Sequence, residues 1–354
     1  MQFSLFSPIP TSAMPSSSTL FATTWDHRRY SYAAVLAATG VGLAFPNQAA
    51  LLLALPLAVG MVVLGIAHGA CDQLVVPARQ PAGRAAAGWH YWLRFLLSYL
   101  GLAAVVGLLW WRWPATTVGV FFGLTIWHWG SADAPSSEQV PAGWWLLHSL
   151  LRGVLLFAVP AWWWPTETAA IVNGLLAFAG AAAVAPLRFG QAAAALGLLA
   201  LGGHLVLWGR YASRRRWGLL RTELVEVPVL VALLLILPPK LSVSVYFIFW
   251  HSLQHVLRLN GWLGYPRAAG VSTPPRLRFN LMAQLAFFLR RAAPLLAISC
   301  GALLVLGHVL ADRLSGETTW FSLALIVASI VTLPHALLVT LVMDAHHWQR
   351  PRSA

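Results

Sequence analysis

Apolar stretches about 20 residues long follow one another along most of this chain, separated by short segments that contain arginine or proline. A helix of about that length crosses the hydrocarbon core of a bilayer. Only 9% of the 354 residues are charged, whereas soluble domains carry about 25%. So few charges cannot cover a surface that faces water. We therefore expect an all-α, polytopic transmembrane helical bundle, in which the backbone hydrogen bonds are satisfied within each helix.

The apolar runs are the candidate spans, and they lie near residues 32–47, 50–76, 91–111, 116–133, 144–163, 168–186, 190–209, 222–238, 241–259, 291–312 and 318–343. The loops at 77–90, 210–221 and 259–290 are rich in arginine, so the positive-inside rule places all three in the cytoplasm. Five candidate spans lie between the loops at 77–90 and 210–221. Five crossings would put these two loops on opposite sides of the membrane, so one of the five candidates cannot cross. The weak candidates lie between 144 and 209. We expect about ten true spans, with one further segment that is re-entrant or interfacial.

The chain shows no internal repeat, so we expect one transmembrane domain at residues 31–345. The beginning of the chain is rich in Ser, Pro and Thr and lacks the basic and then apolar order of a signal peptide. We predict a disordered tail at 1–30 and a short basic tail at 346–354, both cytoplasmic. The expected location is the inner (plasma) membrane, with a multi-pass topology.

The net charge of +13 raises the alternative of a nucleic-acid-binding protein. The arginines, however, cluster in the loops between apolar runs, as they do on the cytoplasmic side of membrane proteins. No basic stripe interleaved with exposed aromatic residues is evident. We therefore expect a lipid bilayer, and no nucleic acid, as the partner of this chain.

Ionisable side chains inside apolar spans are the functional candidates, because their burial in lipid is costly. His251 and His255 are four residues apart, so they project from one helix face and can grip one metal ion. His68 and Asp72 have the same spacing, and the aspartate can accept the second ring N–H of a ligating histidine. His128 is followed by Asp133, five residues on.

Charge placement adds a prediction of depth. With the arginine-rich loops inside, His68, His128, His251 and His255 all fall in the inner part of the bilayer, although they lie on three different spans. Imidazole ligands without thiolate suit iron, zinc, copper or nickel. A redox metal is favoured because oxygen and hydrophobic substrates both enter membranes, whereas hydrolysis needs water.

The remaining histidines are weaker candidates. His148, His204 and His308 are single histidines inside apolar runs, and we expect them to form hydrogen bonds between helices, as such histidines usually do. The same holds for His90, His346 and His347 at helix ends or in the tail. Spacing alone leaves the role of His335 open.

Several motifs together resemble the Brp/Blh family of bacterial and archaeal membrane β-carotene 15,15'-dioxygenases. They are His-Gly-x-x-Asp at 68–72, His-x-Gly-x-x-Asp at 128–133, Tyr-Phe-x-Phe-x-His-Ser-x-x-His at 246–255 and Leu-Pro-His at 333–335. Glu226 and the Pro238–Pro239 pair also match the family in order. The resemblance implies a non-haem Fe(2+) enzyme that uses O2 to cleave β-carotene into two retinal molecules.

By the same resemblance, the metal ligands are His68, His128, His251 and His255. The resemblance places Glu226 and His335 beside the ligands or in the substrate cavity. We assign Asp72 and Asp133 to the same surroundings, where carboxylates would offset the charge of the ion. Retinal as the product would suggest a rhodopsin as its recipient.

Two alternatives stay open. A membrane di-iron hydroxylase or desaturase acting on a carotenoid or lipid normally has about eight histidines in its motifs, whereas this chain has one His-x-x-x-His, and its adjacent pair His346–His347 lies in the tail. A transporter would place polar residues across the whole membrane, and here they gather on one side. That grouping does not exclude a non-enzymatic carotenoid-binding accessory protein.

Overall fold

All regular structure in the described part of the chain is helical, so the all-α prediction is confirmed. The computed structural model describes residues 17–78, 88–135, 140–265, 281–310 and 317–344. The elements are α1 (Ser17–Ala44), α2 (Ala49–Gly60), η1 (Met61–Ile66), η2 (Ala67–Gly69), α3 (Asp72–Ala78), α4 (Trp89–Arg112), α5 (Pro114–Asp133), α6 (Ala142–Trp163), α7 (Pro165–Phe178), α8 (Pro186–Ser213), α9 (Trp217–Ile236), α10 (Pro239–Val245), η3 (Tyr246–Ser252), α11 (Leu253–Trp262), α12 (Leu281–Val309), α13 (Glu317–Leu338) and η6 (Val339–Met343).

Prolines begin four of these helices. Pro114, Pro165, Pro186 and Pro239 occupy the first turns of α5, α7, α8 and α10. Proline suits this position because its ring presets the helical φ and its missing N–H has no partner there in any helix. These four prolines, which separate apolar runs in the sequence, therefore mark the starts of helices.

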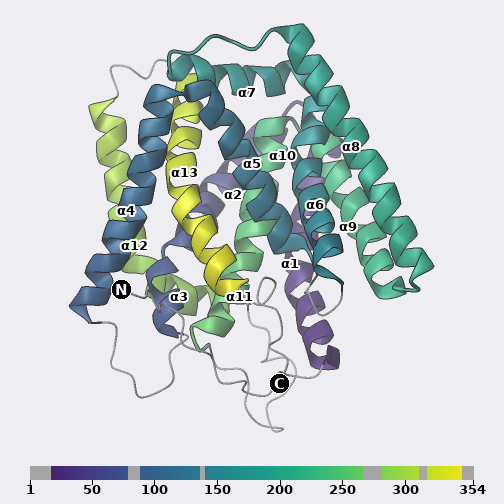
Figure 1. Cartoon of the computed structure of the whole chain (residues 1–354), viewed down its shortest axis with the longest axis horizontal. Helices are drawn as coiled ribbons and strands as arrows, with labels where there is room; N and C mark the ends of the chain where they lie inside the picture. The colour runs from purple at the N-terminus through teal and green to yellow at the C-terminus, as the bar shows by residue number, and fades with distance from the viewer. Residues whose placement is uncertain (1–16, 79–87, 136–139, 266–280, 311–316, 345–354) are drawn as a thin grey trace.

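The long helices form one bundle, and α7 lies across one end of it (Figure 1). Six of the described helical segments are long and apolar enough to cross a membrane: Ala49–Gly69, Trp89–Arg112, Ala142–Trp163, Pro186–Ser213, Leu281–Val309 and Thr319–Met343. Six is fewer than the number of spans predicted from the sequence, which is about ten. At 14 residues, α7 is only about 21 Å long, so it is too short for a hydrocarbon core of about 30 Å.

Charge sets α9 apart from these six segments. The helix has 20 residues, and Arg221, Glu223 and Glu226 all lie in its first half. Glu223 and Glu226 are only 2% and 1% exposed. A helix with this composition packs its acidic face against other helices and cannot expose it to lipid.

The tail predicted at 1–30 overlaps a helix. Because α1 begins at Ser17, the predicted boundary at residue 30 falls inside it. Arg28 in this helix forms an ion pair with Glu226 of α9, so this part of the chain belongs to the bundle. Residues 1–16 and the predicted C-terminal tail at 346–354 lie outside the described residues.

Two predicted spans are interrupted rather than continuous. The run at 50–76 is divided into α2, the π-helical turn η1, the 3-10 turn η2 and α3. The run at 241–259 is divided into α10, the π-helical turn η3 and α11. The two π turns pack together at a glycine, because a Cβ atom on Gly65 of η1 would lie 3.2 Å from Cε1 of Phe247 in η3. Turns of this kind are frequent at functional sites.

Helices α5 and α6 cross at backbone distance. A Cβ atom on Gly130 of α5 would lie 1.8 Å from the carbonyl oxygen of Ser149, and one on Gly153 of α6 would lie 1.9 Å from that of Ile126. Glycine is the residue that permits such an approach between helices in a membrane. The crossing fixes the C-terminal half of α5, which carries His128.

We predict that Gly153→Ala destabilises the bundle, because the new methyl group meets backbone atoms that cannot move aside. Such overpacking costs about 1–3 kcal/mol, and it should lower the midpoint of thermal unfolding of the detergent-purified protein. Gly123→Ala in α5 is the control, because a Cβ atom there has open space around it. Equal midpoints for the two variants would contradict the close crossing.

Candidate functional site

Five imidazole rings from separate parts of the chain lie together in the bundle: His68 of η2, His128 of α5, His251 of η3, His255 of α11 and His335 of α13. We call them the histidine cluster. The four predicted ligands are thus brought together. The fifth ring, that of His335, was left open by its spacing, and it lies among them.

The ring spacings are short. The ring centroids of His128 and His251 are 4.9 Å apart, and those of His68 and His335 are also 4.9 Å apart. The centroid of His335 lies 5.0 Å from that of His128 and 5.2 Å from that of His255. Two imidazoles that bind one ion through N–metal bonds of about 2 Å bring their ring centres to about 4.5–6 Å.

Most of the ring nitrogens in the cluster lack a hydrogen-bond partner. Both ring nitrogens of His128, His251 and His255, and Nε2 of His335, are buried without one within the described chain. These four residues are at most 5% exposed. Buried polar atoms in native proteins are nearly always paired. The arrangement therefore indicates a ligand that interacts with several imidazoles at once.

The ring nitrogens of the cluster do not point toward one common position. Among the residues that the structure describes, no three His, Cys, Asp or Glu side chains are placed so that they would hold a metal ion as they stand. The cluster has the ring spacing and the unpaired nitrogens of a metal centre, while its nitrogen atoms would have to turn toward a common ion. Imidazole rotation about the side-chain bonds can supply such a change.

Asp72 lies at the cluster, but beside a different histidine from the one expected. Its Oδ2 atom lies 2.8 Å from Nδ1 of His335 and accepts a hydrogen bond from the hydroxyl of Tyr99 at 3.2 Å. The expected pairing with His68 assumed a continuous helix. The chain instead leaves helical geometry between Gly69 and Asp72, so the four-residue spacing does not place the two side chains together.

The backbone provides the partner of His68. Its Nδ1 atom lies 2.6 Å from the carbonyl oxygen of Gly65. Since a carbonyl only accepts, Nδ1 carries the hydrogen and Nε2 is left with a lone pair. Asp72 has the same effect on His335, whose Nε2 is therefore available to a ligand.

Asp133 and Glu226 lie in a separate, buried ion network. Asp133 accepts hydrogen bonds from the hydroxyl of Tyr246 and the indole N–H of Trp250, both at 3.0 Å. Glu226 pairs with Arg28 and Arg152. No hydrogen bond joins either carboxylate to the five histidines in the described ranges. Their link to the cluster runs through the backbone, because Trp250 directly precedes His251.

Arg152 is the central residue of this network, and sequence reasoning did not identify it as a functional residue. Its side chain is 1% exposed and lies 3.6 Å from Glu223 and 3.7 Å from Asp133. Nδ1 of His148 forms a hydrogen bond with the hydroxyl of Tyr211 on α8 at 2.7 Å, which agrees with the expectation of a hydrogen-bonded histidine between helices, and its Nε2 atom lies 3.1 Å from Glu223. The sequence did contain a signal that could have identified this network, because Arg152, Glu223 and Glu226 all lie inside apolar runs.

Aromatic rings form one wall of the histidine cluster. Trp129 and Phe247 stack on each other with centroids 5.7 Å apart, and both rings lie beside that of His251. Tyr246 and Trp250 direct their polar atoms to Asp133 instead. This wall therefore presents an apolar aromatic surface to the histidine cluster.

The comparisons with known proteins agree on one family. The family model described as "Beta-carotene 15,15'-dioxygenase" matches residues 59–343, which is more than half of the chain. The chain is also similar to the "Probable beta-carotene 15,15'-dioxygenase Blh" of Halobacterium salinarum. The two are 30% identical over 332 residues, which is 88% of each chain. No solved structure matches the chain.

We predict that Arg152→Met strongly destabilises the protein, because it leaves the buried carboxylates of Glu223 and Glu226 without their shared cation. Removing one partner of a buried ion pair costs about 3–5 kcal/mol, to be measured by denaturant unfolding in detergent. Arg210→Met is the control. Arg210 lies over the Trp144 ring at 4.9 Å, a contact worth at most about 1 kcal/mol. Similar losses in both variants would refute the central position of Arg152.

Proposed function

We propose that this chain, which belongs to the beta-carotene 15,15'-dioxygenase family, uses O2 to cleave the central 15,15' double bond of β-carotene into two molecules of retinal. Family membership supports a carotenoid-cleaving dioxygenase as the class of enzyme. The structural observation that supports the reaction centre is the histidine cluster with its buried, unpaired ring nitrogens.

The histidine cluster fits the Fe(2+) ion that the family resemblance implies. Imidazole nitrogen is a suitable ligand for iron, and the ring nitrogens that would bind it have no competing partner among the described side chains. We propose His68, His128, His251 and His255 as ligands. When bound, the iron supplies the one-electron chemistry by which O2 reacts with a carbon–carbon double bond.

We propose that His335 contributes a fifth imidazole to the metal centre, beside the four ligands. Its Nδ1–H donates to Asp72 at 2.8 Å, so its Nε2 atom is held as an acceptor beside the rings of His68, His128 and His255. A carboxylate in this position fixes the tautomer and the ring orientation of a ligating histidine and makes it more basic. Asp72 therefore acts through His335, and it places a negative charge next to the cluster.

Trp129 and Phe247 exclude water from the cluster and offer an apolar surface to the polyene. Their rings lie beside His251 at centroid distances of 5.8 and 6.2 Å. A conjugated hydrocarbon has no polar group to direct it, so shape and apolar contact must position its central bond. Asp133 stabilises the segment that carries Phe247, because it accepts hydrogen bonds from Tyr246 and Trp250.

The substrate would reach the enzyme from the bilayer. Large apolar side chains are exposed on the outer helices, among them Leu97 of α4, Leu201 of α8 and Leu304 of α12. We propose that this surface faces lipid in the inner (plasma) membrane and that both termini are cytoplasmic. A rhodopsin is the proposed recipient of retinal.

The interior helices complete the membrane topology that we propose. In addition to the six apolar segments, α1, α5, α9 and the interrupted α10–α11 segment would cross the bilayer, with α7 at the interface. Buried ion pairs, such as that of Arg28 with Glu226, keep the acidic side chains of α9 away from lipid. Glu223 and Glu226 therefore do not prevent α9 from crossing.

Replacing one cluster histidine tests the proposed reaction. In His251→Ala we expect bound iron and retinal formation from β-carotene both to fall at least about 100-fold, because an imidazole ligand is lost. His308→Ala is the control, since His308 is exposed on α12. Iron content per purified chain and retinal yield are measured together. Unchanged values in His251→Ala would refute the metal assignment, and bound iron without any turnover in the parent would indicate an accessory protein.

Asp72→Asn tests the role of the carboxylate. We expect iron to bind about 10- to 100-fold more weakly, as for other partners of ligating histidines, and activity to return when iron is supplied in excess. Asp344→Asn is the control, because Asp344 pairs with Arg258 outside the cluster. The measurement is an iron titration against a competing chelator. Equal iron affinity in the two variants would contradict the role of Asp72.

A further inference from the structure

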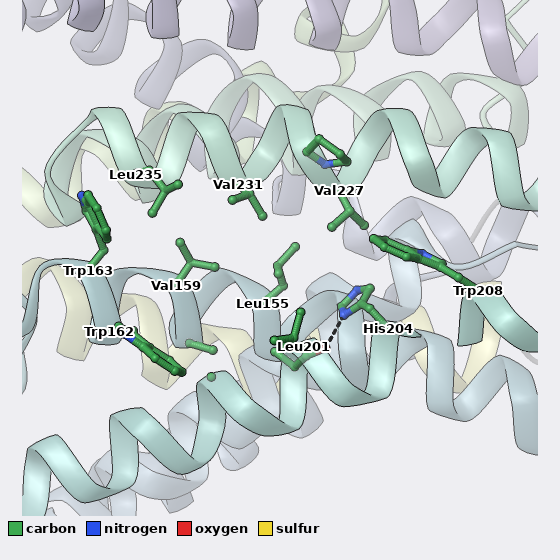
Figure 2. A pocket seen from close by; sticks show the side chains of 14 residues that line it. Leu155, Val159, Trp162, Trp163, Leu201, His204, Trp208, Val227, Val231 and Leu235 are labelled. Atoms are coloured by element: carbon green, nitrogen blue, oxygen red, sulfur yellow. Dashed lines mark hydrogen bonds between the residues drawn. The ribbon is translucent and has the colours of Figure 1, made fainter. Parts of the chain in front are cut away.

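A second apolar site lies away from the histidine cluster, between α6, α8 and α9 (Figure 2). It is a cavity of about 470 Å³, a volume in the range of small-molecule sites. Trp162 and Trp163 lie at one end, and His204 and Trp208 lie at the other. None of the five cluster histidines lines it.

The walls between these two ends are almost entirely aliphatic. Leu155, Val159 and Val231 line the middle of the cavity, and Val227 lies closer to His204 and Trp208. Val227 directly follows Glu226, which faces the ion network, so α9 presents its polar face to the bundle and its apolar face to this cavity. A ligand here would be mainly apolar.

One end of the cavity carries two unpaired polar atoms. His204 and Trp208 lie one turn apart on α8, with ring centroids 6.0 Å apart. Nε2 of His204 and Nε1 of Trp208 are both buried without a hydrogen-bond partner in the part of the chain that the structure describes. The His204 side chain is 97% buried, since 3% of it is exposed.

The hydrogen-bonding roles of these two atoms are determined by their surroundings. Nδ1 of His204 lies 2.7 Å from the carbonyl oxygen of Ala200. A carbonyl accepts only, so Nδ1 carries the hydrogen and Nε2 is an acceptor. The indole Nε1–H of Trp208 is a donor only. One acceptor and one donor therefore belong to two neighbouring side chains that line the same end of the cavity.

A hydroxyl group matches this pair, because it donates one hydrogen bond and accepts others. It would donate to His204 and accept from Trp208. An aldehyde, a ketone or an ether accepts from Trp208 but leaves His204 unpaired. An unpaired buried acceptor is unfavourable, so the pair discriminates between alcohols and other oxygen groups.

The site is open on its lipid side. Trp162, Trp163 and Leu201 line it and are 52%, 60% and 60% exposed. They lie on α6 and α8, both apolar enough to cross a membrane. A molecule dissolved in the bilayer can therefore enter between these helices without passing through water.

We propose that this cavity binds an apolar alcohol from the bilayer, with its hydroxyl group between His204 and Trp208 and its hydrocarbon chain along α6 and α9 toward Trp162. This inference does not depend on the proposed cleavage reaction. The site does not share a residue with the histidine cluster, so either assignment can fail while the other stands.

All-trans-retinol is a suitable probe, because energy transfer from tryptophan to retinol reports binding and the cavity contains three tryptophans. The purified full chain in detergent micelles is titrated with retinol, with its methyl ether and with retinal. We expect the ether and the aldehyde to bind about tenfold more weakly than the alcohol, the effect of one lost hydrogen bond to a buried group. Equal binding of alcohol and ether would overturn the proposal without any variant.

Two variants locate the binding site. Val231→Phe fills the cavity, and we expect it to reduce retinol binding at least about tenfold. Leu205→Phe is the control, because Leu205 is on α8 but 56% exposed and does not line the cavity. In His204→Phe, the preference for alcohol over ether should disappear. The unfolding midpoint and the iron content of each variant report whether it is folded. Unchanged retinol binding in a folded Val231→Phe protein would place the alcohol elsewhere.

Discussion

The buried ion network around Arg152 is the interaction on which the rest of the bundle depends. Arg152 of α6 lies between Glu223 and Glu226 of α9, while Arg28 of α1 pairs with Glu226. Charges inside a low-dielectric bundle are tolerated only when they are paired. Because the arginines come from α1 and α6 and both glutamates come from α9, the charges are paired only when these three helices are assembled. The network therefore favours the arrangement in which α1, α6 and α9 lie side by side.

The same network positions the histidine cluster without touching it. Asp133 ends α5 beside Arg152 and holds Tyr246 and Trp250 of η3. His128 lies five residues before Asp133, and His251 directly follows Trp250. Two of the five rings are thus attached to elements that the ion network fixes. This geometry separates two roles that sequence reasoning had combined, since Asp133 and Glu226 organise the helices whereas Asp72 supports an imidazole.

Helix interruptions explain the rest of the cluster. A regular helix would place Asp72 on the face of His68, but the turns at η1 and η2 redirect the chain, and Asp72 meets His335 instead. The π turn η3 packs against η1, where Gly65 allows Phe247 to approach closely. The irregular turns therefore bring together histidines from segments far apart in the sequence.

The sequence alone determined the all-helical class and the apolar runs, because these depend on composition. Spacing, charge placement and the family resemblance together singled out His68, His128, His251 and His255 as candidates. The sequence also indicated that His148 has a structural role. It did not reveal that Asp72 forms a hydrogen bond with His335, or that Arg152 pairs with both Glu223 and Glu226. It also did not reveal that His204 and Trp208 line a cavity. Each of these depends on which residues of distant helices meet. Periodicity identifies the face of a helix but not the partner of that face, and a break in a helix changes even the face. Only the packed bundle decides those pairings.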